Sequence, residues 1–340
     1  MRGVVFLGDC KLELATFPDP TPEPGEVVVE IKASGLCGSD LHVYRQPHDP
    51  AAAPVIRGHE PSGVVAAVGP GVFNPQARVG ARVMVHHYHG CTDCEHCRTG
   101  WPQMCQEVPV TVYSADAHGA HAPYMKVAAV TLVPLDERLS FAAGAAIACG
   151  TGTAWGAFER MELTGRDTVA VFGQGPVGLS ATLLAKAQGA RVIALDIDET
   201  RLATAKAFGA DHVVNSRDGR AVEAIREITS GRGASMALET AGATAAGQDA
   251  VRSVRPWGTV CLVGLGAELR ISLGSLLRTQ MRILTSWTMS IQAQRACAEF
   301  VVERGIDLDA LFTERWSLDQ AEAAYRVFNL QSGGKGVFLM

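Results

Sequence analysis

The spacing of apolar residues changes near residue 140. Before that point, short Val-rich runs are bounded by Gly and Pro, as in residues 25–35, 63–69 and 81–88. Such runs between turn residues predict β-strands, and together they predict a mainly antiparallel β domain with few helices. Residues 1–14 carry a short apolar run broken by Gly8, which predicts a first strand and not a secretory signal.

After residue 140 the pattern becomes that of alternating helices and strands. Residues 141–161 are rich in Ala and are predicted to be helical with breaks at Gly, and from about residue 289 the tail returns to mixed helix and strand. Buried parallel strands read as continuous apolar runs. Six such runs lie in residues 168–172, 191–196, 212–214, 235–242, 258–266 and 282–287. They predict a doubly wound parallel α/β sheet.

Composition narrows the class of protein. A chain of 340 residues favours two domains. With 47% hydrophobic and 19% charged residues the chain is globular, and it has no apolar run long enough to cross a membrane. The net charge of −5 speaks against a general nucleic-acid binder. We therefore expect a cytoplasmic protein with no nucleic-acid or membrane partner, in which most of the nine cysteines are free for metal binding.

The segment GQGPVG, residues 173–178, fits the pattern G-x-G-x-x-G. It directly follows the predicted strand 168–172 and opens a predicted helix. Gly173, Gly175 and Gly178 permit a tight turn and close backbone approach, and the unpaired N–H groups of the helix start face a pyrophosphate. The context indicates a dinucleotide site.

Asp196 ends the next predicted strand. A carboxylate there can accept hydrogen bonds from the ribose hydroxyls of NAD and repels the additional phosphate of NADP. The alternative is an ordinary βαβ unit with a capping Asp. NAD is the predicted coenzyme, and Arg201 is the one nearby basic residue that speaks for NADP.

Four cysteines with the spacing C-x2-C-x2-C-x7-C, namely Cys91, Cys94, Cys97 and Cys105, lie within residues 86–108. Four thiolates close a tetrahedral zinc shell and leave no position for substrate, so such a site orders a loop. An iron–sulfur cluster is the competing interpretation, and disulfide pairing is a third.

A second candidate ligand set is dispersed along the chain. Cys37 lies in GLCGSDLH, His59 in GHE and Cys149 in ACGTGT. Each of these residues alone is more often a core residue than a ligand. Together they supply the two thiolates and one imidazole of a catalytic zinc with an open fourth position.

These segments, in this order, resemble the zinc-dependent, medium-chain alcohol dehydrogenase family, which includes alcohol, sorbitol and threonine dehydrogenases. The resemblance extends nearly from end to end. It implies a GroES-like catalytic domain, formed by residues 1–145 and 289–340, around a Rossmann coenzyme domain at 146–288, with the active site in the cleft between them. It also implies two zinc ions per chain, one of them structural in the four-cysteine lobe.

By this resemblance Cys37, His59 and Cys149 are the catalytic zinc ligands. Glu60 matches an acidic residue at or near the metal. Asp40 matches a carboxylate that orients the histidine ligand, which fixes its tautomer and raises its basicity.

The resemblance also implies a proton path and the coenzyme contacts. Ser39 matches the hydroxyl that takes the alcohol proton, and His42 the end of the relay to solvent. Thr153, Val263 and Leu265 match positions near the nicotinamide, and Arg201 a residue that flanks the adenosine ribose. The full coenzyme set is Gly173, Gly175, Pro176, Val177, Gly178, Asp196, Arg201, Thr153, Val263 and Leu265.

The predicted function is NAD-linked oxidation of a primary or secondary alcohol by hydride transfer. Sorbitol-type relatives usually carry Glu-Pro where Cys149-Gly150 stands here, but His87 matches a position that often lines the substrate pocket. A polyol, sugar or amino-alcohol dehydrogenase is therefore the alternative. A zinc-ribbon interaction module is a more remote one. A zinc-free reductase is set aside because both cysteine sets are present.

Two further expectations concern the rest of the chain. The resemblance implies a homodimer or homotetramer joined through the coenzyme domain near Ile283–Trp287, where an unpaired edge strand would favour pairing. Cys10, Cys261 and Cys297 show no ligand spacing and are predicted to be buried apolar residues.

Overall fold

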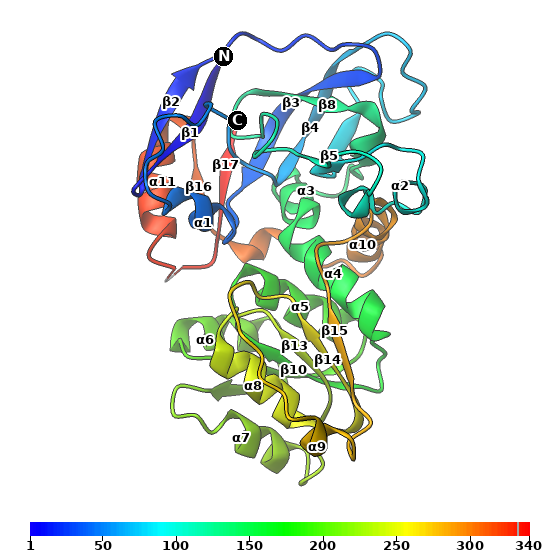
Figure 1. Ribbon diagram of the computed structural model, residues 1–340, viewed down its shortest axis with the longest axis vertical. Coiled ribbons are helices and arrows are strands. Elements are labelled where there is room, and N and C mark those ends of the chain that lie inside the picture. Colours follow the sequence, from blue (N-terminus) through cyan, green and yellow to red (C-terminus); the bar gives the residue numbers. More distant parts are fainter. Residues whose placement is uncertain (332) are drawn as a thin grey trace. The chain divides into compact units, whose positions relative to one another are not determined.

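The computed structural model describes residues 1–331 and 333–340 and divides them into two compact units (Figure 1). Unit 1 comprises Met1–Gly152 and Ser290–Met340, and unit 2 comprises Thr153–Met289. Both chain ends thus belong to unit 1. The division after Gly152, and not after residue 145, keeps Cys149 in unit 1.

Unit 1 is built on a seven-stranded sheet of order β16-β17-β3-β4-β5-β9, with β8 also paired to β3. Only the β16–β17 pair is parallel among these pairings. The strand bounds of unit 1 are β1 Arg2–Gly8, β2 Lys11–Thr16, β3 Glu26–Gly35, β4 Pro61–Val68, β5 Arg82–Val85, β6 Tyr88–His89, β7 Thr111–Val112, β8 Tyr124–Ala128, β9 Leu132–Pro134, β16 Phe312–Trp316 and β17 Lys335–Leu339. The mainly antiparallel β domain predicted for the first part of the chain is confirmed.

The C-terminal strand β17 completes this sheet beside β3 (Figure 1). Val337, Phe338 and Leu339 pair antiparallel with the last residues of β3, so the start of β17 lies next to the segment that follows Gly35. A core of alternating β3 side chains with β5 and β8 partners packs on the sheet; it includes Val27, Val29, Ile31, Val83, Val85, Met125 and Val127. β3 is buried along most of its length, with only Glu26, Glu30 and Lys32 partly exposed, and it lies within the predicted strand 25–35.

The β1–β2 hairpin contradicts one prediction. Its turn contains Gly8, Asp9 and Cys10, all with positive φ. Such a turn bulges into solvent, and Cys10 is exposed instead of buried. Cys261 and Cys297 are buried, as predicted.

The helices that lie wholly within unit 1 have four to eight residues, except α10, which has 13. Their bounds are α1 Asp40–Tyr44, α2 Glu95–Arg98, α3 Phe141–Ala148, α10 Ile291–Glu303 and α11 Ala321–Phe328, with single 3-10 turns at η1 Pro102–Met104, η2 Ala129–Thr131, η3 Asp309–Leu311 and η4 Leu318–Gln320. The Ala-rich helix predicted for 141–161 is interrupted at Cys149, whose φ of −144° and ψ of −82° end α3 before α4 (Gly150–Met161) begins. Cys149 is thereby held at a break between two helices.

Unit 2 is the predicted doubly wound sheet. Its six parallel strands have the order β12-β11-β10-β13-β14-β15, which is the Rossmann order 3-2-1-4-5-6. The bounds are β10 Thr168–Phe172, β11 Arg191–Asp196, β12 His212–Asn215, β13 Ala234–Glu239, β14 Val254–Leu262 and β15 Arg282–Thr285, with helices α5 Pro176–Ala187, α6 Glu199–Ala207, α7 Ala221–Ile228, α8 Thr244–Ser253 and α9 Leu273–Leu276. Among all described residues, no helix combines the length and apolar character needed to cross a bilayer.

Candidate active site

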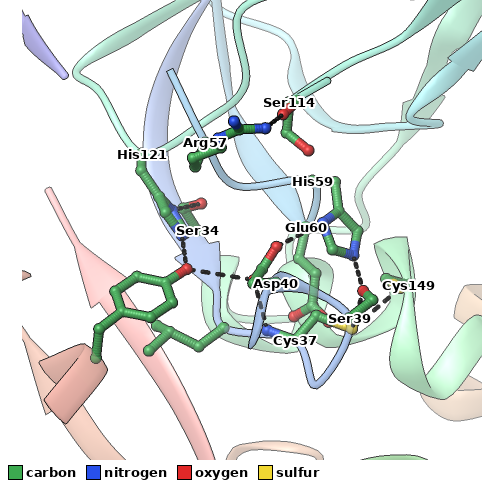
Figure 2. A network of polar contacts seen from close by, with 12 residues as sticks. Ser34, Cys37, Ser39, Asp40, Arg57, His59, Glu60, Ser114, His121 and Cys149 are labelled. Carbon is green, nitrogen blue, oxygen red and sulfur yellow. Dashed lines mark hydrogen bonds and ion pairs between the residues drawn. The ribbon is translucent and has the colours of Figure 1, made fainter. Parts of the chain in front are cut away.

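Cys37, Ser39 and Asp40 come together in the turn that follows β3 (Figure 2). The Cys37 N–H donates to Asp40 Oδ2 at 2.9 Å, and the Asp40 N–H donates to the Cys37 carbonyl at 3.0 Å. Ser39 Oγ lies 3.2 Å from Cys37 Sγ. Cys37 and Asp40 thus hold this turn by two hydrogen bonds, one in each direction. The turn carries a thiol, a hydroxyl and a buried carboxylate within one short segment.

His59 reaches this turn from the segment before β4. Its Nδ1 lies 3.0 Å from Asp40 Oδ1, and its Nε2 lies 3.2 Å from Ser39 Oγ. Gly58 must be Gly, because its φ is +92° and a Cβ would lie 2.3 Å from His121 Nδ1. Since Asp40 occupies Nδ1, the Nε2 atom is the one available to a metal.

Cys149 brings the third ligand atom. Its Sγ lies 3.9 Å from Cys37 Sγ, and ligand atoms of Cys37, His59, Glu60 and Cys149 all lie within 4.8 Å of one another. Two sulfurs bonded to one tetrahedral zinc at about 2.3 Å are separated by about 3.8 Å, whereas a disulfide has a length of about 2.05 Å. The donor set therefore fits a metal and excludes a disulfide.

Glu60, the carboxylate of this cluster, pairs with a residue that the sequence did not indicate. Lys335 Nζ, on β17, is 2.5 Å from Glu60 Oε2, and both side chains are buried. Burial raises the pKa of Glu60, against the opposing effect of the Lys335 ammonium. Burial lowers the pKa of Lys335, but the charges of Glu60 and Cys37 shift it upward overall. Gly35 accommodates this carboxylate, because a Cβ there would lie 1.9 Å from Oε2.

The two sulfurs of the cluster are electrostatically unequal. The hydrogen bond from Cys149, and then the charge of His59, lower the pKa of Cys37 despite burial. The same hydrogen bond and burial raise the pKa of Cys149. Cys37 is therefore the first of the pair to become a thiolate, the form that binds metals.

The four-cysteine lobe forms a second sulfur cluster. The separations are 3.8 Å between the Sγ atoms of Cys91 and Cys97, and 4.0 Å between those of Cys94 and Cys105. Backbone N–H groups of Cys94 and Asp93 point at Cys91 Sγ from 3.2 and 3.5 Å. The backbone hydrogen bond from Cys91, with those of Val108 and Glu107, lowers the pKa of Cys105 to about 6. These contacts fit four metal-bound thiolates in a closed shell.

The three glycines of the segment GQGPVG, residues 173–178, have different structural roles in unit 2. Gly173 has a φ of +88°, and a Cβ on Gly178 would lie 1.8 Å from the Gly173 carbonyl oxygen, so these two allow the turn and the helix–strand contact. A Cβ on Gly175 would meet open space. Gly175 is the N-cap of α5, with Pro176 first and Val177 second in the helix. The N-terminus of α5 thus leaves room for an anionic group.

Asp196, at the end of β11, holds the glycine-rich turn as well as the start of the next loop. Its Oδ2 accepts the Gln174 N–H at 2.6 Å, and its Oδ1 accepts those of Ile197 and Asp198 at 2.7 and 3.0 Å. Arg201 Nη1 lies 3.9 Å from Oδ2. A carboxylate oxygen has two acceptor sites, so Oδ2 retains one for a ribose hydroxyl.

The other expected site residues lie in different places. Thr153 is buried in α4, while Val263 and Leu265 follow the carboxyl end of β14, where Leu265 is exposed. His42 is exposed on α1. His87 is buried, its ring centroid 5.0 Å from that of His59, and burial followed by the charge of His59 lowers its pKa.

Three buried residues of the site escaped the sequence analysis. Lys335 could have been noticed as a lone charge in an apolar terminal strand, since such a Lys requires a partner. His121 and Tyr325 carry no local spacing signal, because the contacts that join them to Asp40 span long stretches of chain.

Comparisons with known proteins point to one family. Residues 23–137 match the family described as alcohol dehydrogenase GroES-like domain, and residues 176–303 match zinc-binding dehydrogenase. The chain is 36% identical to an uncharacterized zinc-type alcohol dehydrogenase-like protein, YphC, of Escherichia coli K12, over 99% of this chain and 98% of that protein. It is 34% identical to a sorbitol dehydrogenase of Bacillus subtilis, over 95% and 92% of the two chains.

A solved structure gives the same fold. The rspB protein of Escherichia coli CFT073, described as a short chain alcohol dehydrogenase and complexed with NADH, has a TM-score of 0.89 and 26% identity, over 100% of this chain and 99% of that chain. The two family matches, the relatives that cover nearly the whole chain and the solved structure thus point to one family. The chain belongs to the zinc-dependent medium-chain alcohol dehydrogenases, a family of oxidoreductases.

Proposed function

We propose that the protein is a zinc-dependent, NAD-linked dehydrogenase that oxidises a primary or secondary alcohol to an aldehyde or ketone. The observation that carries the proposal is the cluster of Cys37, His59 and Cys149, in which ligand atoms lie within 4.8 Å of one another beside the Ser39 hydroxyl. A thiolate–imidazole–thiolate set with a neighbouring hydroxyl suits an open catalytic site better than a closed structural one.

In this proposal Cys37, His59 and Cys149 hold the catalytic zinc. A zinc ion bound there supplies a Lewis acid that lowers the pKa of an alcohol hydroxyl. Asp40 keeps the proton on His59 Nδ1 and so presents Nε2 to the metal. Glu60 is the buried carboxylate beside these ligands and is already paired with Lys335.

Ser39 and His42 are the proposed proton path. Ser39 Oγ lies 3.2 Å from both Cys37 Sγ and His59 Nε2, which supports a role in accepting the alcohol proton while its own hydroxyl proton passes toward His42. His42, one turn later and exposed, is suited to release a proton to solvent. General base catalysis of this kind requires contact with the proton that is removed.

Unit 2 would hold the coenzyme. Bound NAD supplies the hydride acceptor. The open space at Gly175 supports a pyrophosphate at the start of α5, and the remaining acceptor of Asp196 supports recognition of the ribose. Thr153, Val263 and Leu265 are the proposed contacts of the nicotinamide, and Arg201 that of the adenosine ribose.

A second zinc is proposed for Cys91, Cys94, Cys97 and Cys105, which makes two per chain. The sulfur separations of 3.8 and 4.0 Å support this assignment. All nine cysteines are free thiols and all lie in the described part of the chain. Because both clusters need reduced thiols, we also propose a cytoplasmic location.

A polyol or amino-alcohol dehydrogenase is the alternative. The 34% identity to a sorbitol dehydrogenase supports it, and so does the buried imidazole of His87 beside His59. Cys149 speaks for a simple alcohol, because the family resemblance implies Glu-Pro at residues 149 and 150 in sorbitol-type members.

We propose a homodimer or homotetramer formed through unit 2. Strand β15 is the edge of the six-stranded sheet, and the exposed apolar side chains of Leu273 and Leu277 lie in the segment just before it. An open edge of this kind favours pairing. Analytical ultracentrifugation of the full chain would test it, and a monomer at micromolar concentration would refute it.

The proposed reaction is tested by following NADH formation with primary alcohols, secondary alcohols, vicinal diols, polyols and threonine, with NADP in parallel. Turnover of simple or aromatic alcohols supports the proposal. Turnover confined to polyols or threonine would support the alternative, and an absence of turnover by a zinc-loaded protein would oppose both.

A further inference from the structure

A chain of buried hydrogen bonds continues beyond Asp40, away from the proposed zinc site (Figure 2). The Tyr325 hydroxyl, from α11, lies 3.3 Å from Asp40 Oδ2. His121 Nε2 lies 2.7 Å from the same hydroxyl, and Ser34 Oγ on β3 lies 2.7 Å from His121 Nδ1. Ser34, His121 and Tyr325 are each 0% exposed. Because solvent does not reach these side chains, a hydrogen bond lost by one of them cannot be replaced by bulk water.

The direction of every bond follows from the metal end. If His59 uses Nε2 for zinc, its Nδ1 carries the proton and donates to Asp40 Oδ1. The Asp40 carboxylate then accepts from the Cys37 N–H and from Tyr325. Since Tyr325 has only one proton, its oxygen must accept from His121 Nε2–H.

The far end of the chain is then fixed as well. Burial lowers the pKa of His121 to about 4, so the ring is neutral and has a single N–H. With that proton on Nε2, Nδ1 is an acceptor and takes the Ser34 hydroxyl proton. The reverse order would leave the phenol oxygen facing the Asp40 carboxylate without a proton between them, which is costly in a buried site.

We propose that Tyr325 is a positioning residue for the catalytic zinc: with His121 and Ser34 it fixes the Asp40 carboxylate, and through it the tautomer and orientation of His59. The inference rests on the proposed zinc at Cys37, His59 and Cys149. It assigns a role to a C-terminal helix that supplies none of the proposed ligands. Groups that orient a metal ligand through a hydrogen bond commonly change metal affinity by about 10–100-fold when removed.

The decisive variant is Tyr325→Phe, which removes only the hydroxyl. Tyr44→Phe is the matched control, because Tyr44 is buried in the same aromatic cluster, with its ring centroid 5.4 Å from that of Tyr325, and lies on the same helix as Asp40. Ser34→Ala removes the terminal donor and leaves Tyr325 in place. Zinc release from the full-length, zinc-loaded protein is followed with a chromogenic chelator, and the phase lost in Cys37→Ser identifies the catalytic site.

We expect Tyr325→Phe to release this zinc about tenfold faster than the wild type, with a smaller effect of the same sign in Ser34→Ala and none in Tyr44→Phe. The absorption spectrum of the cobalt-substituted site should change in Tyr325→Phe and stay as in the wild type in Tyr44→Phe. Equal release rates in Tyr325→Phe and Tyr44→Phe would overturn the inference.

A measurement on the wild type needs no variant to fold. Nitrogen-15 shifts of labelled histidine in the zinc-loaded protein should show His121 protonated at Nε2 and unprotonated at Nδ1. The opposite tautomer would also overturn the inference. A wild type without any zinc phase that depends on Cys37 would instead refute the proposed function, and this inference with it.

Discussion

Lys335 Nζ lies 2.5 Å from Glu60 Oε2, and the two side chains are 2% and 0% exposed. The ammonium comes from the last strand of the chain and the carboxylate from the residue next to His59. Lys335 Nζ also lies 3.3 Å from the Leu36 carbonyl oxygen, beside Cys37. One buried cation thus joins the two segments that carry the first two proposed zinc ligands.

Loss of this cation should be costly. Removing one partner of a buried ion pair leaves an uncompensated charge, which typically costs about 3–5 kcal/mol. We expect Lys335→Met to lower the free energy of urea-induced unfolding by about that amount, and Lys335→Met with Glu60→Gln to recover part of it. Lys126→Met, which breaks a more exposed pair with Glu26, should cost only about 0–1 kcal/mol. Equal losses in Lys335→Met and Lys126→Met would contradict this interpretation.

The parts of the candidate site that could be predicted from the sequence are those whose residues stand at a fixed spacing within one short segment. The lobe of Cys91 to Cys105 and the turn at Gly173 are such short segments. Their residue types and spacing indicate metal binding and a dinucleotide turn without any knowledge of the rest of the fold. The strands of unit 2 are buried on both faces, so their continuous apolar runs were also recognisable. The candidate ligands Cys37, His59 and Cys149 could be proposed only by combining three segments that lie far apart in the sequence.

The remaining features depend on tertiary packing. Lys335 and Tyr325 reach the site because β17 pairs with β3 and α11 packs near α1, which no local pattern encodes. Cys10 was misjudged because its burial depends on the turn between β1 and β2 and not on its residue type. The helix predicted for 141–161 was expected to break at Gly, but α3 ends at Cys149, where φ is −144° and ψ is −82°.

The two cysteine clusters should differ when one thiol is replaced. Cys91→Ser should lose one zinc per chain and destabilise or aggregate the protein, because the closed shell orders its loop. Cys37→Ser should also lose one zinc but remain folded, bind NADH and be inactive. Metal analysis, thermal unfolding and NADH fluorescence check this, with exposed Cys10→Ser as the control. Full activity in Cys37→Ser would refute the catalytic assignment.

The glycines of the coenzyme turn should separate stability from binding. In Gly178→Ala the new Cβ meets the Gly173 carbonyl oxygen, so we expect a loss of about 1–3 kcal/mol in unfolding free energy. In Gly175→Ala the Cβ enters open space, so stability should stay within about 1 kcal/mol while NADH binds about tenfold more weakly. Calorimetric titration with NADH and urea unfolding measure the two effects. Unchanged NADH affinity in Gly175→Ala would exclude coenzyme from this face.

Asp196→Ala should change coenzyme choice. The variant loses the proposed ribose acceptor and the repulsion of a phosphate, so NAD should bind about tenfold more weakly and the preference over NADP should relax. It also leaves three backbone N–H groups without their acceptor, which lowers stability. Asp198→Ala removes only the cap of α6, at about 1 kcal/mol, and should keep the preference. An unchanged NAD to NADP ratio in Asp196→Ala would refute the ribose role.

Acid should destabilise the protein through a buried neutral histidine. Burial lowers the pKa of His86 from 6.5 to about 4, so the unfolded chain binds this proton first as the pH falls. The associated stability, about 3 kcal/mol, is present above pH 6.5 and is lost between there and about pH 4. Urea unfolding is measured at several pH values. Between pH 6.5 and about pH 4 the free energy of unfolding should fall less in His86→Gln than in the wild type or in His48→Gln, whose histidine is exposed. Parallel curves for all three proteins would show that His86 does not carry the effect.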